Sequence, residues 1–182
     1  LDIIGPIMVD REKKANVPVC VHLDHGETVE YLEKALRIGF TSVMFDGSTL
    51  PYDENVRLTA QVARMANDFH ADTEGELGSM GLRESGEGET ADDDATKIYT
   101  DPDAAAAFVR ETGVRALACS FGTTHGIYLK KPKLDFGIVR AVREKTGGVP
   151  VVMHGGSGVS ADDFHAAIRA GVRKINYFTY MD

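Results

Sequence analysis

The feature that most constrains the fold is an alternation of two kinds of segment. Six short apolar or β-branched runs recur along the 182 residues, and segments with helical spacing lie between them. Each run is almost continuously apolar, which is typical of strands buried on both faces. Strands that alternate with helices in this way form a parallel sheet covered by helices. The runs are residues 17–23, 41–45, 71–77, 114–120, 149–153 and 172–176.

Helix boundaries are marked by residues with known end preferences. Residues 27–38 place apolar side chains on one face and stop at Gly39. Asp101 precedes a proline, the usual order of an N-cap and a first helical position. Ser160 and Asp163 have the spacing of a capping box. These signals predict separate helices between the strands.

Polar residues at strand ends decide between an open doubly wound sheet and a (β/α)8 TIM barrel. An open dinucleotide-binding sheet would need GxGxxG after the first strand, and that motif is absent there. Chemistry contributed by many strand ends to one face is typical of the barrel. We therefore predict an α/β TIM barrel in which residues 1–182 form a single domain. The polar residues are Asp24, His25, Asp46, Glu76, His125, His154 and Asn176.

Six strands are too few for a closed eight-stranded barrel. We expect a fragment that covers about six of the eight strands, with N- and C-terminal parts missing. Such a piece leaves strands unpaired, so we also expect it to fold poorly alone.

Composition excludes several classes of function. The formal charge is −8, so the chain lacks the basic excess of a nucleic-acid binder. It contains no apolar run of the roughly 18 residues that a membrane span needs, and no secretory signal. Cys20 and Cys119 lie in apolar runs without a CxxC partner, so we expect both to be buried and reduced. These features predict a cytoplasmic protein.

Three of the six histidines carry a candidate metal site. His25, His125 and His154 each end a predicted strand and precede a glycine. Three imidazoles with an open fourth position are a typical catalytic Zn²⁺ arrangement. His22 shares a strand face with Asp24 by two-residue periodicity, and it either orients Asp24 or packs in the core.

Two other segments suggest substrate contacts. Gly155-Gly156-Ser157-Gly158 precedes a helix, where backbone N–H groups can bind a phosphate without basic side chains. Residues 176–179 follow the next strand and can contact the same anion. Residues 79–98 form a long, acidic, glycine-containing loop that we interpret as either a solvated flap or a mobile lid.

Four motifs together resemble the class II, zinc-dependent ketose-bisphosphate aldolases. They are HLDHG at 22–26, EGELG at 74–78, GTTHG at 122–126 and HGGSG at 154–158. The resemblance implies a (β/α)8 barrel that cleaves fructose or tagatose 1,6-bisphosphate into dihydroxyacetone phosphate and glyceraldehyde 3-phosphate. It implies a lyase of carbohydrate metabolism and glycolysis, assembled as a homodimer or homotetramer.

The resemblance also implies roles for individual residues. His25, His125 and His154 would hold the catalytic zinc, and Asp46 and Glu76 would hold a second divalent or monovalent cation. Asp24 would exchange a proton with the aldehyde oxygen, and Glu84 with the triose carbon. The substrate contacts would come from Gly126, Gly155, Gly156, Ser157, Asn176, Tyr177, Phe178 and Thr179.

The chain departs from the family's sequence pattern at two positions, and several alternative functions stay open. Leu82 replaces a glycine common in the family's lid, and Phe178 replaces a smaller residue near the substrate. The alternatives are another phosphosugar aldolase, a Schiff-base aldolase using Lys174, a metal-dependent hydrolase and a non-catalytic phosphosugar-binding subunit. The motifs favour the zinc aldolase.

Overall fold

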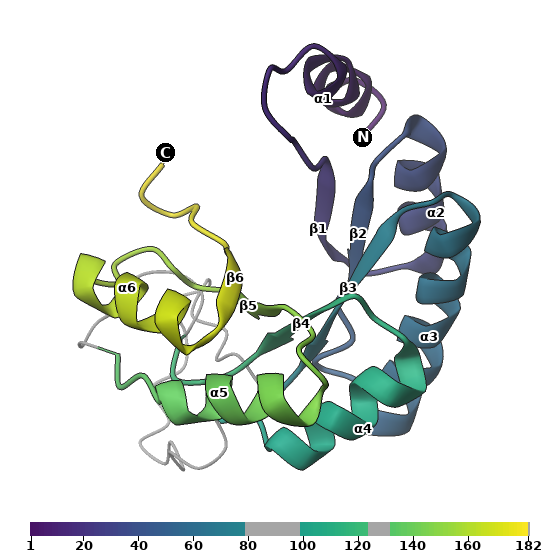
Figure 1. Cartoon of the computed structure of the whole chain (residues 1–182). Helices are drawn as coiled ribbons and strands as arrows, with labels where there is room; N and C mark the ends of the chain where they lie inside the picture. The colour runs from purple at the N-terminus through teal and green to yellow at the C-terminus, as the bar shows by residue number, and fades with distance from the viewer. Residues whose placement is uncertain (79–98, 124–131, 182) are drawn as a thin grey trace, which may run out of the picture. The chain divides into compact units, whose positions relative to one another are not determined.

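A computed structural model describes residues 1–78, 99–123 and 132–181 (Figure 1). The predicted lid with Leu82 and Glu84, together with His125 and Gly126, lies outside the described residues. The strands are β1 (His22–Gly26), β2 (Ser42–Phe45), β3 (Asp72–Leu77), β4 (Ala116–Cys119), β5 (Val151–Met153) and β6 (Val172–Ile175). The helices are α1 (Ile4–Lys13), α2 (Val29–Ile38), α3 (Tyr52–Asp68), α4 (Pro102–Thr112), α5 (Phe136–Lys145) and α6 (Ala161–Ala170).

The strand order in the sheet follows the chain order, from β1 to β6. The registered pairs β1–β2, β2–β3, β4–β5 and β5–β6 are all parallel. Successive parallel strands joined through helices, in chain order, are the topology of consecutive β/α units of a (β/α)8 barrel. The chain divides into two compact units, which are described separately below.

Unit 1 comprises Leu1–Glu76 and Glu111–Ala116. Its core is formed where α2 and α3 cover β2, and the side chains of Leu32, Val43 and Val62 there are fully buried. Thr28 caps α2 by accepting a hydrogen bond from the Tyr31 N–H, and the helix ends at Gly39 as predicted. This packing holds the carboxyl ends of β1, β2 and β3 side by side.

Unit 2 comprises Leu77–Arg110 and Leu117–Asp182. Leu117 of β4 pairs with Val151 of β5, and Val151 pairs with Val172 of β6. The predicted helix start at Ser160 is confirmed, since Ser160 Oγ caps α6 by accepting from the Asp163 N–H at 3.2 Å. The β-strand core is fully apolar at these positions.

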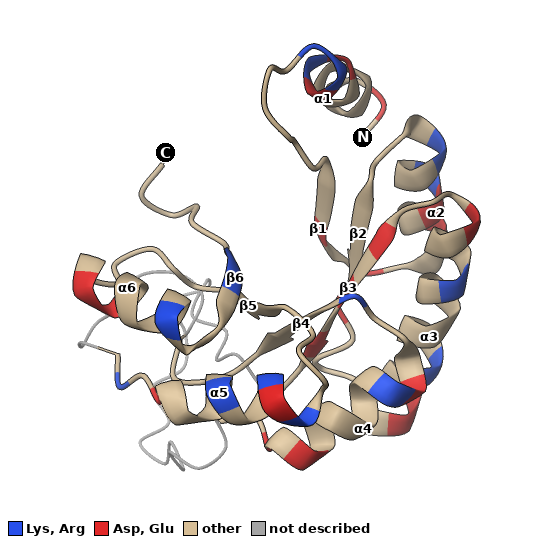
Figure 2. Ribbon diagram, viewed as in Figure 1, with Lys and Arg blue, Asp and Glu red and all other residues tan. Residues whose placement is uncertain are grey.

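Figure 2 shows charged residues along the helices, and in α2 and α6 their order follows the helix dipole. Helix α2 has Glu30 in its first turn and Arg37 in its last, and α6 has Asp162 in its first turn and Arg169 in its last. Negative charge near a helix N-terminus and positive charge near its C-terminus each stabilise the helix modestly. Among the described helices, none is long and apolar enough to cross a bilayer.

Two sequence predictions are wrong at the start of the chain. The first strand begins at His22 rather than at residue 17, because Pro18 cannot donate a ladder hydrogen bond. Val17 is 68% exposed, and Cys20 is exposed rather than buried. Cys119 is buried, as expected. Helix α1, which precedes the first predicted strand, was not predicted.

Candidate active site

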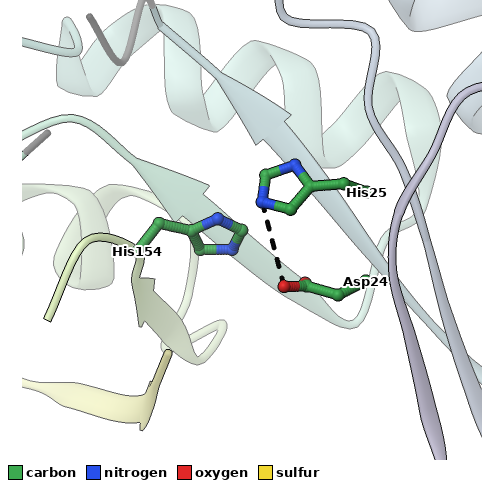
Figure 3. Close-up of side chains that lie close together, drawn as sticks. All are labelled: Asp24, His25 and His154. Carbon is green, nitrogen blue, oxygen red and sulfur yellow. Dashed lines mark ion pairs between the residues drawn. The ribbon is translucent and has the colours of Figure 1, made fainter. Parts of the chain in front are cut away.

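The end of β1 carries two functional side chains on one side of the strand. Strict alternation would place the neighbours Asp24 and His25 on opposite faces. The β1–β2 register shifts between Leu23 and Gly26, and His25 has a φ of 48°. A bulge with a left-handed residue re-aims a side chain, and such backbone strain is concentrated at functional sites. As a result, His25 Nε2 lies 3.8 Å from Asp24 Oδ2 (Figure 3).

Gly26 allows this bulge to pack against the helix that follows. A Cβ added at Gly26 would lie 2.3 Å from Leu32 Cδ2 and 3.0 Å from the Met44 carbonyl oxygen. Any larger residue would therefore displace α2 or the strand end. The glycine after His25 is explained by close approach rather than by chain flexibility.

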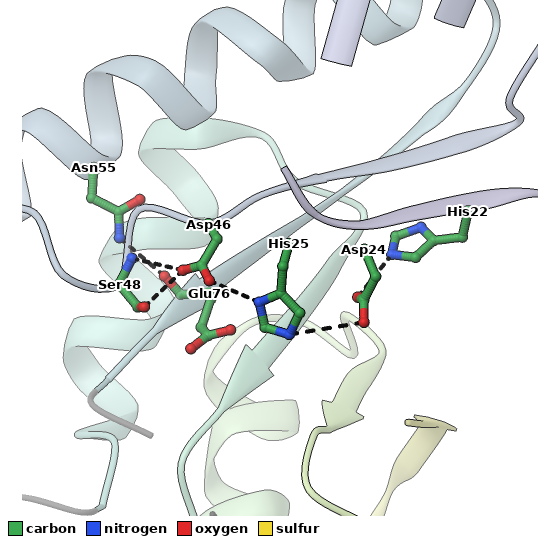
Figure 4. Close-up of polar contacts among 7 residues, drawn as sticks. All are labelled: His22, Asp24, His25, Asp46, Ser48, Asn55 and Glu76. Atoms are coloured by element: carbon green, nitrogen blue, oxygen red, sulfur yellow. Dashed lines mark hydrogen bonds and ion pairs between the residues drawn. The ribbon is translucent and has the colours of Figure 1, made fainter. Parts of the chain in front are cut away.

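Asp46, at the end of β2, holds the His25 ring (Figure 4). His25 Nδ1 donates to Asp46 Oδ2 at 2.7 Å, and Ser48 Oγ donates to Asp46 Oδ1 at 2.7 Å. Burial alone would lower the pKa of His25, but the Asp46 hydrogen bond and the charges of Asp24 and Glu76 raise it to about 9. Burial alone would raise the pKa of Asp46, but the His25 and Ser48 hydrogen bonds lower it to about 2. The pair is therefore an imidazolium and a carboxylate at neutral pH.

Glu76, near the end of β3, is a buried carboxylic acid beside this pair. Burial, reinforced by the negative charges of Asp46 and Glu74, raises its pKa to about 8, while the positive charge of His25 opposes the rise. The buried Asn55 Nδ2 of α3 donates to the Glu76 carbonyl oxygen at 3.0 Å and fixes the local backbone. A bound cation would favour the ionised form of this carboxyl group.

The residues of this centre fit a metal ion. His25, Asp46 and Glu76 each offer one ligand atom, and these atoms lie within 4.8 Å of one another. Imidazole nitrogen and carboxylate oxygen are common Zn²⁺ ligands. Ligating histidines typically donate their second ring N–H to a carboxylate, as His25 Nδ1 does to Asp46. The donor set therefore suits a divalent metal.

A second polar group lies on the other side of Asp24. His22 Nε2 is 3.4 Å from Asp24 Oδ1 and 3.7 Å from Glu74 Oε2. His22 Nδ1 is 2.8 Å from Ser42 Oγ. The predicted sharing of a strand face by His22 and Asp24 is thus consistent with their contact.

In unit 2, the two predicted phosphate segments lie against each other. The Phe178 N–H donates to Ser157 Oγ at 3.1 Å, and the Gly156 N–H donates to the Asn176 carbonyl oxygen at 2.9 Å. A Cβ at Gly156 would lie 2.7 Å from that carbonyl oxygen, so only glycine permits this approach. His154 follows β5 directly and is fully buried.

The structure places the predicted residues in two groups. Unit 1 brings together Asp24, His25, Asp46 and Glu76, and unit 2 brings together residues 155–157 and 176–178. The three-histidine zinc set remains a prediction, as do the roles assigned to the individual residues. Sequence reasoning missed Ser42, Ser48, Asn55 and Glu74. Glu74 could have been found, because it shares the inward face of β3 with Glu76.

Fold and site together define an α/β protein with consecutive β/α units and a histidine–carboxylate centre at its strand ends. The family model for fructose-bisphosphate aldolase class-II matches residues 1–182. The chain belongs to this family. The confirmed fold is a partial TIM barrel, since the chain resembles the crystal structure of the YdjI aldolase from Escherichia coli K12. That match has a TM-score of 0.84 and 37% identity, covering 98% of this chain and 60% of the other.

Curated relatives agree on the family and differ in their printed names. A fructose-bisphosphate aldolase from Geobacillus stearothermophilus is 42% identical over 166 residues, covering 90% of this chain and 55% of that protein. A 6-phospho-5-dehydro-2-deoxy-D-gluconate aldolase from Shouchella clausii is 42% identical over 163 residues, covering 90% and 53%. The chain therefore spans a little over half the length of these relatives.

Proposed function

We propose that this chain forms the catalytic part of a zinc-dependent aldolase that reversibly cleaves a ketose 1,6-bisphosphate. The products would be dihydroxyacetone phosphate and glyceraldehyde 3-phosphate. The observation that carries the proposal is His25, held between Asp46 on one side and Asp24 on the other. This arrangement places a candidate metal ligand beside the Asp24 carboxylate, whose side chain is 41% exposed and so accessible to substrate.

Zinc would be held by Nε2 of His25 together with His125 and His154, while Asp46 orients the His25 ring through Nδ1. When bound, the metal supplies a Lewis acid that polarises the substrate carbonyl and stabilises the negative charge left by carbon–carbon cleavage. Asp46 and Glu76 would hold a second cation. The buried Asn55 keeps the Glu76 backbone in place for this role.

Asp24 would handle the proton of the cleaved bond. In cleavage its carboxylate takes the proton from the hydroxyl group of the departing fragment, and the carbon–oxygen bond becomes the aldehyde carbonyl as the carbon–carbon bond breaks. In condensation the same proton returns to the aldehyde oxygen. A general acid–base of this kind contributes roughly 10²–10⁴-fold in rate. Glu84 would exchange the proton at the triose carbon.

The phosphate would be bound in unit 2 and by Gly126. Gly155, Gly156 and Ser157 precede α6, and their backbone N–H groups suit an anion without basic side chains. Asn176, Tyr177, Phe178 and Thr179 would complete the site, and the Phe178 N–H already contacts Ser157. Family membership also supports a cytoplasmic homodimer or homotetramer that acts in glycolysis or related carbohydrate metabolism.

A phosphorylated deoxyketo acid is a second candidate substrate, supported by the name of one relative and by the side chain of Phe178. The Shouchella clausii protein is named for a phosphorylated deoxyketo acid. Phe178 is 70% exposed at a position proposed to face the substrate. A bulky side chain there would change which sugar is accepted without altering the metal centre.

The experiment measures triose phosphate release by the full reading frame that contains this chain. Fructose and tagatose 1,6-bisphosphate and the phosphorylated deoxyketo acid are supplied with metal, with chelator, and with chelator followed by excess Zn²⁺. Release that chelation abolishes and zinc restores supports the proposal, and the ratio of rates names the sugar. Chelator-insensitive release with borohydride trapping on Lys174 contradicts it. No release from metal-loaded protein favours the binding subunit.

A further inference from the structure

Three side chains next to Asp24 have no part in the function proposed above. His22, Ser42 and Glu74, which we call the His22 cluster, come from the adjacent strands β1, β2 and β3. His22 and Ser42 are partners in the strand register, and their side chains meet at 2.8 Å. The His22 and Glu74 side chains are only 13% and 2% exposed. The His22 cluster is thus a largely buried group of hydrogen-bonded and polar side chains beside the exposed Asp24 carboxylate.

The contacts of His22 determine which ring nitrogen carries the hydrogen. Nε2 faces carboxylate oxygens of both Asp24 and Glu74, at 3.4 and 3.7 Å. A bare nitrogen lone pair directed at two negative groups would be repelled, so Nε2 carries its hydrogen. The Ser42 hydroxyl then donates to Nδ1 and holds the ring at that end.

Polar contacts, rather than burial in the core, position the Asp24 side chain. Its side chain is 41% exposed at the end of a strand, and an exposed carboxylate samples several rotamers. A proton transfer requires the carboxylate oxygen within hydrogen-bond distance of the reacting hydroxyl group, so loss of that orientation lowers the rate. His22 Nε2 lies 3.4 Å from Asp24 Oδ1, in a polar contact that falls short of a hydrogen bond, and its ring is held at Nδ1 by Ser42.

We propose that His22, held by Ser42 and Glu74, is a positioning residue that orients the Asp24 carboxylate for proton transfer. The inference rests on the proposed function, because it assigns Asp24 to the proton of the cleaved bond. His22 touches neither substrate nor metal in this account. Its replacement should therefore impair only the step that uses Asp24.

The test uses the full-length holoenzyme and two reactions. Cleavage of the preferred ketose bisphosphate requires Asp24, whereas exchange of the triose-carbon hydrogen of dihydroxyacetone phosphate with solvent does not. The variants are His22→Ala, which removes the donor, and His22→Gln, whose amide N–H can replace it. His165→Ala, an exposed histidine on α6, is the matched control.

We expect His22→Ala to lower kcat for cleavage by about tenfold or more, with KM and the exchange rate changed by less than about twofold. His22→Gln should recover a substantial part of kcat, and His165→Ala should match the unsubstituted enzyme. Equal loss of cleavage and exchange would overturn the proposal, since His22 would then support the metal or the fold. Unchanged cleavage would overturn it too.

Two further outcomes are informative. If His22→Ala does not fold, Ser42→Ala frees the ring and should give a smaller loss that is again confined to cleavage; loss of both reactions overturns the proposal. If the unsubstituted, metal-loaded enzyme performs neither reaction, the proposed function itself fails and this inference falls with it. The two failures are therefore distinguishable.

Discussion

If His25 is a metal ligand as proposed, metal binding there has to displace a proton, because only a neutral imidazole can ligate a metal ion. Burial lowers the pKa of His25, but the Asp46 hydrogen bond and the neighbouring carboxylates outweigh burial and raise it to about 9. In the metal-free protein Nε2 is therefore neutral in about 1% of molecules at pH 7 and about 10% at pH 8. The sign follows directly: zinc binding weakens as pH falls below 9.

We expect the apparent Kd for Zn²⁺ to tighten about tenfold between pH 7 and pH 8 and to level off above pH 9. Asp46→Asn removes the hydrogen bond that does most to raise the pKa of His25. That variant should show a flatter pH dependence, and its zinc affinity at pH 9 should be about 10–100-fold weaker because the ring loses its orienting carboxylate. Asp103→Asn, at an exposed ion pair of α4, is the matched control.

The assay is competition for zinc against a chromophoric chelator of known affinity at each pH, using the apo full-length protein. Calorimetry in two buffers of different ionisation enthalpy counts the protons released, with about one from His25 expected at pH 7.5. A Kd that stays constant from pH 7 to pH 8, with no proton released, would refute the reasoning. So would an Asp46→Asn variant as steep as the unsubstituted protein.

Two buried polar side chains, Asn55 and Thr100, give predictions about stability. Asn55→Ala removes the donor to the Glu76 carbonyl oxygen and should lower the free energy of unfolding by about 1–3 kcal/mol in a denaturant titration; an unchanged midpoint would contradict this. Thr100→Val keeps the side-chain shape but removes the hydroxyl that donates to the Leu77 carbonyl and accepts from the Ser120 N–H. It should cost about 1–3 kcal/mol, and a gain in thermal stability would argue against the assigned bonds.

Most strands could be predicted because runs of apolar residues and helix-capping residues can be recognised in the sequence itself. The apolar runs around Val43, Leu117 and Val152 do form buried strands, and the Ser160 cap lies where its spacing predicted. The run at 17–21 misled because β-branched composition outweighed the single Pro18, which cannot join a ladder.

The site geometry could not be predicted, because it depends on contacts between elements. The bulge that turns Asp24 and His25 to one side lies at a shift in the β1–β2 register, and a Cβ added at Gly26 there would clash with Leu32. Glu74 stands in one of the four sequence motifs, but the sequence alone assigned it no contact or role. Its function as a buried partner of His22 emerges only when β1 and β3 lie near each other.

The central claim is that His25 holds a metal while Asp24 moves a proton. The most direct measurement compares His25→Ala with Asp24→Asn in the full-length protein, recording bound zinc, bisphosphate cleavage and hydrogen exchange at the triose carbon. We predict that His25→Ala loses zinc and both reactions. Asp24→Asn should keep zinc and exchange but lose about 10²–10⁴-fold in cleavage. Full cleavage by Asp24→Asn, or zinc-independent cleavage by His25→Ala, would contradict the account.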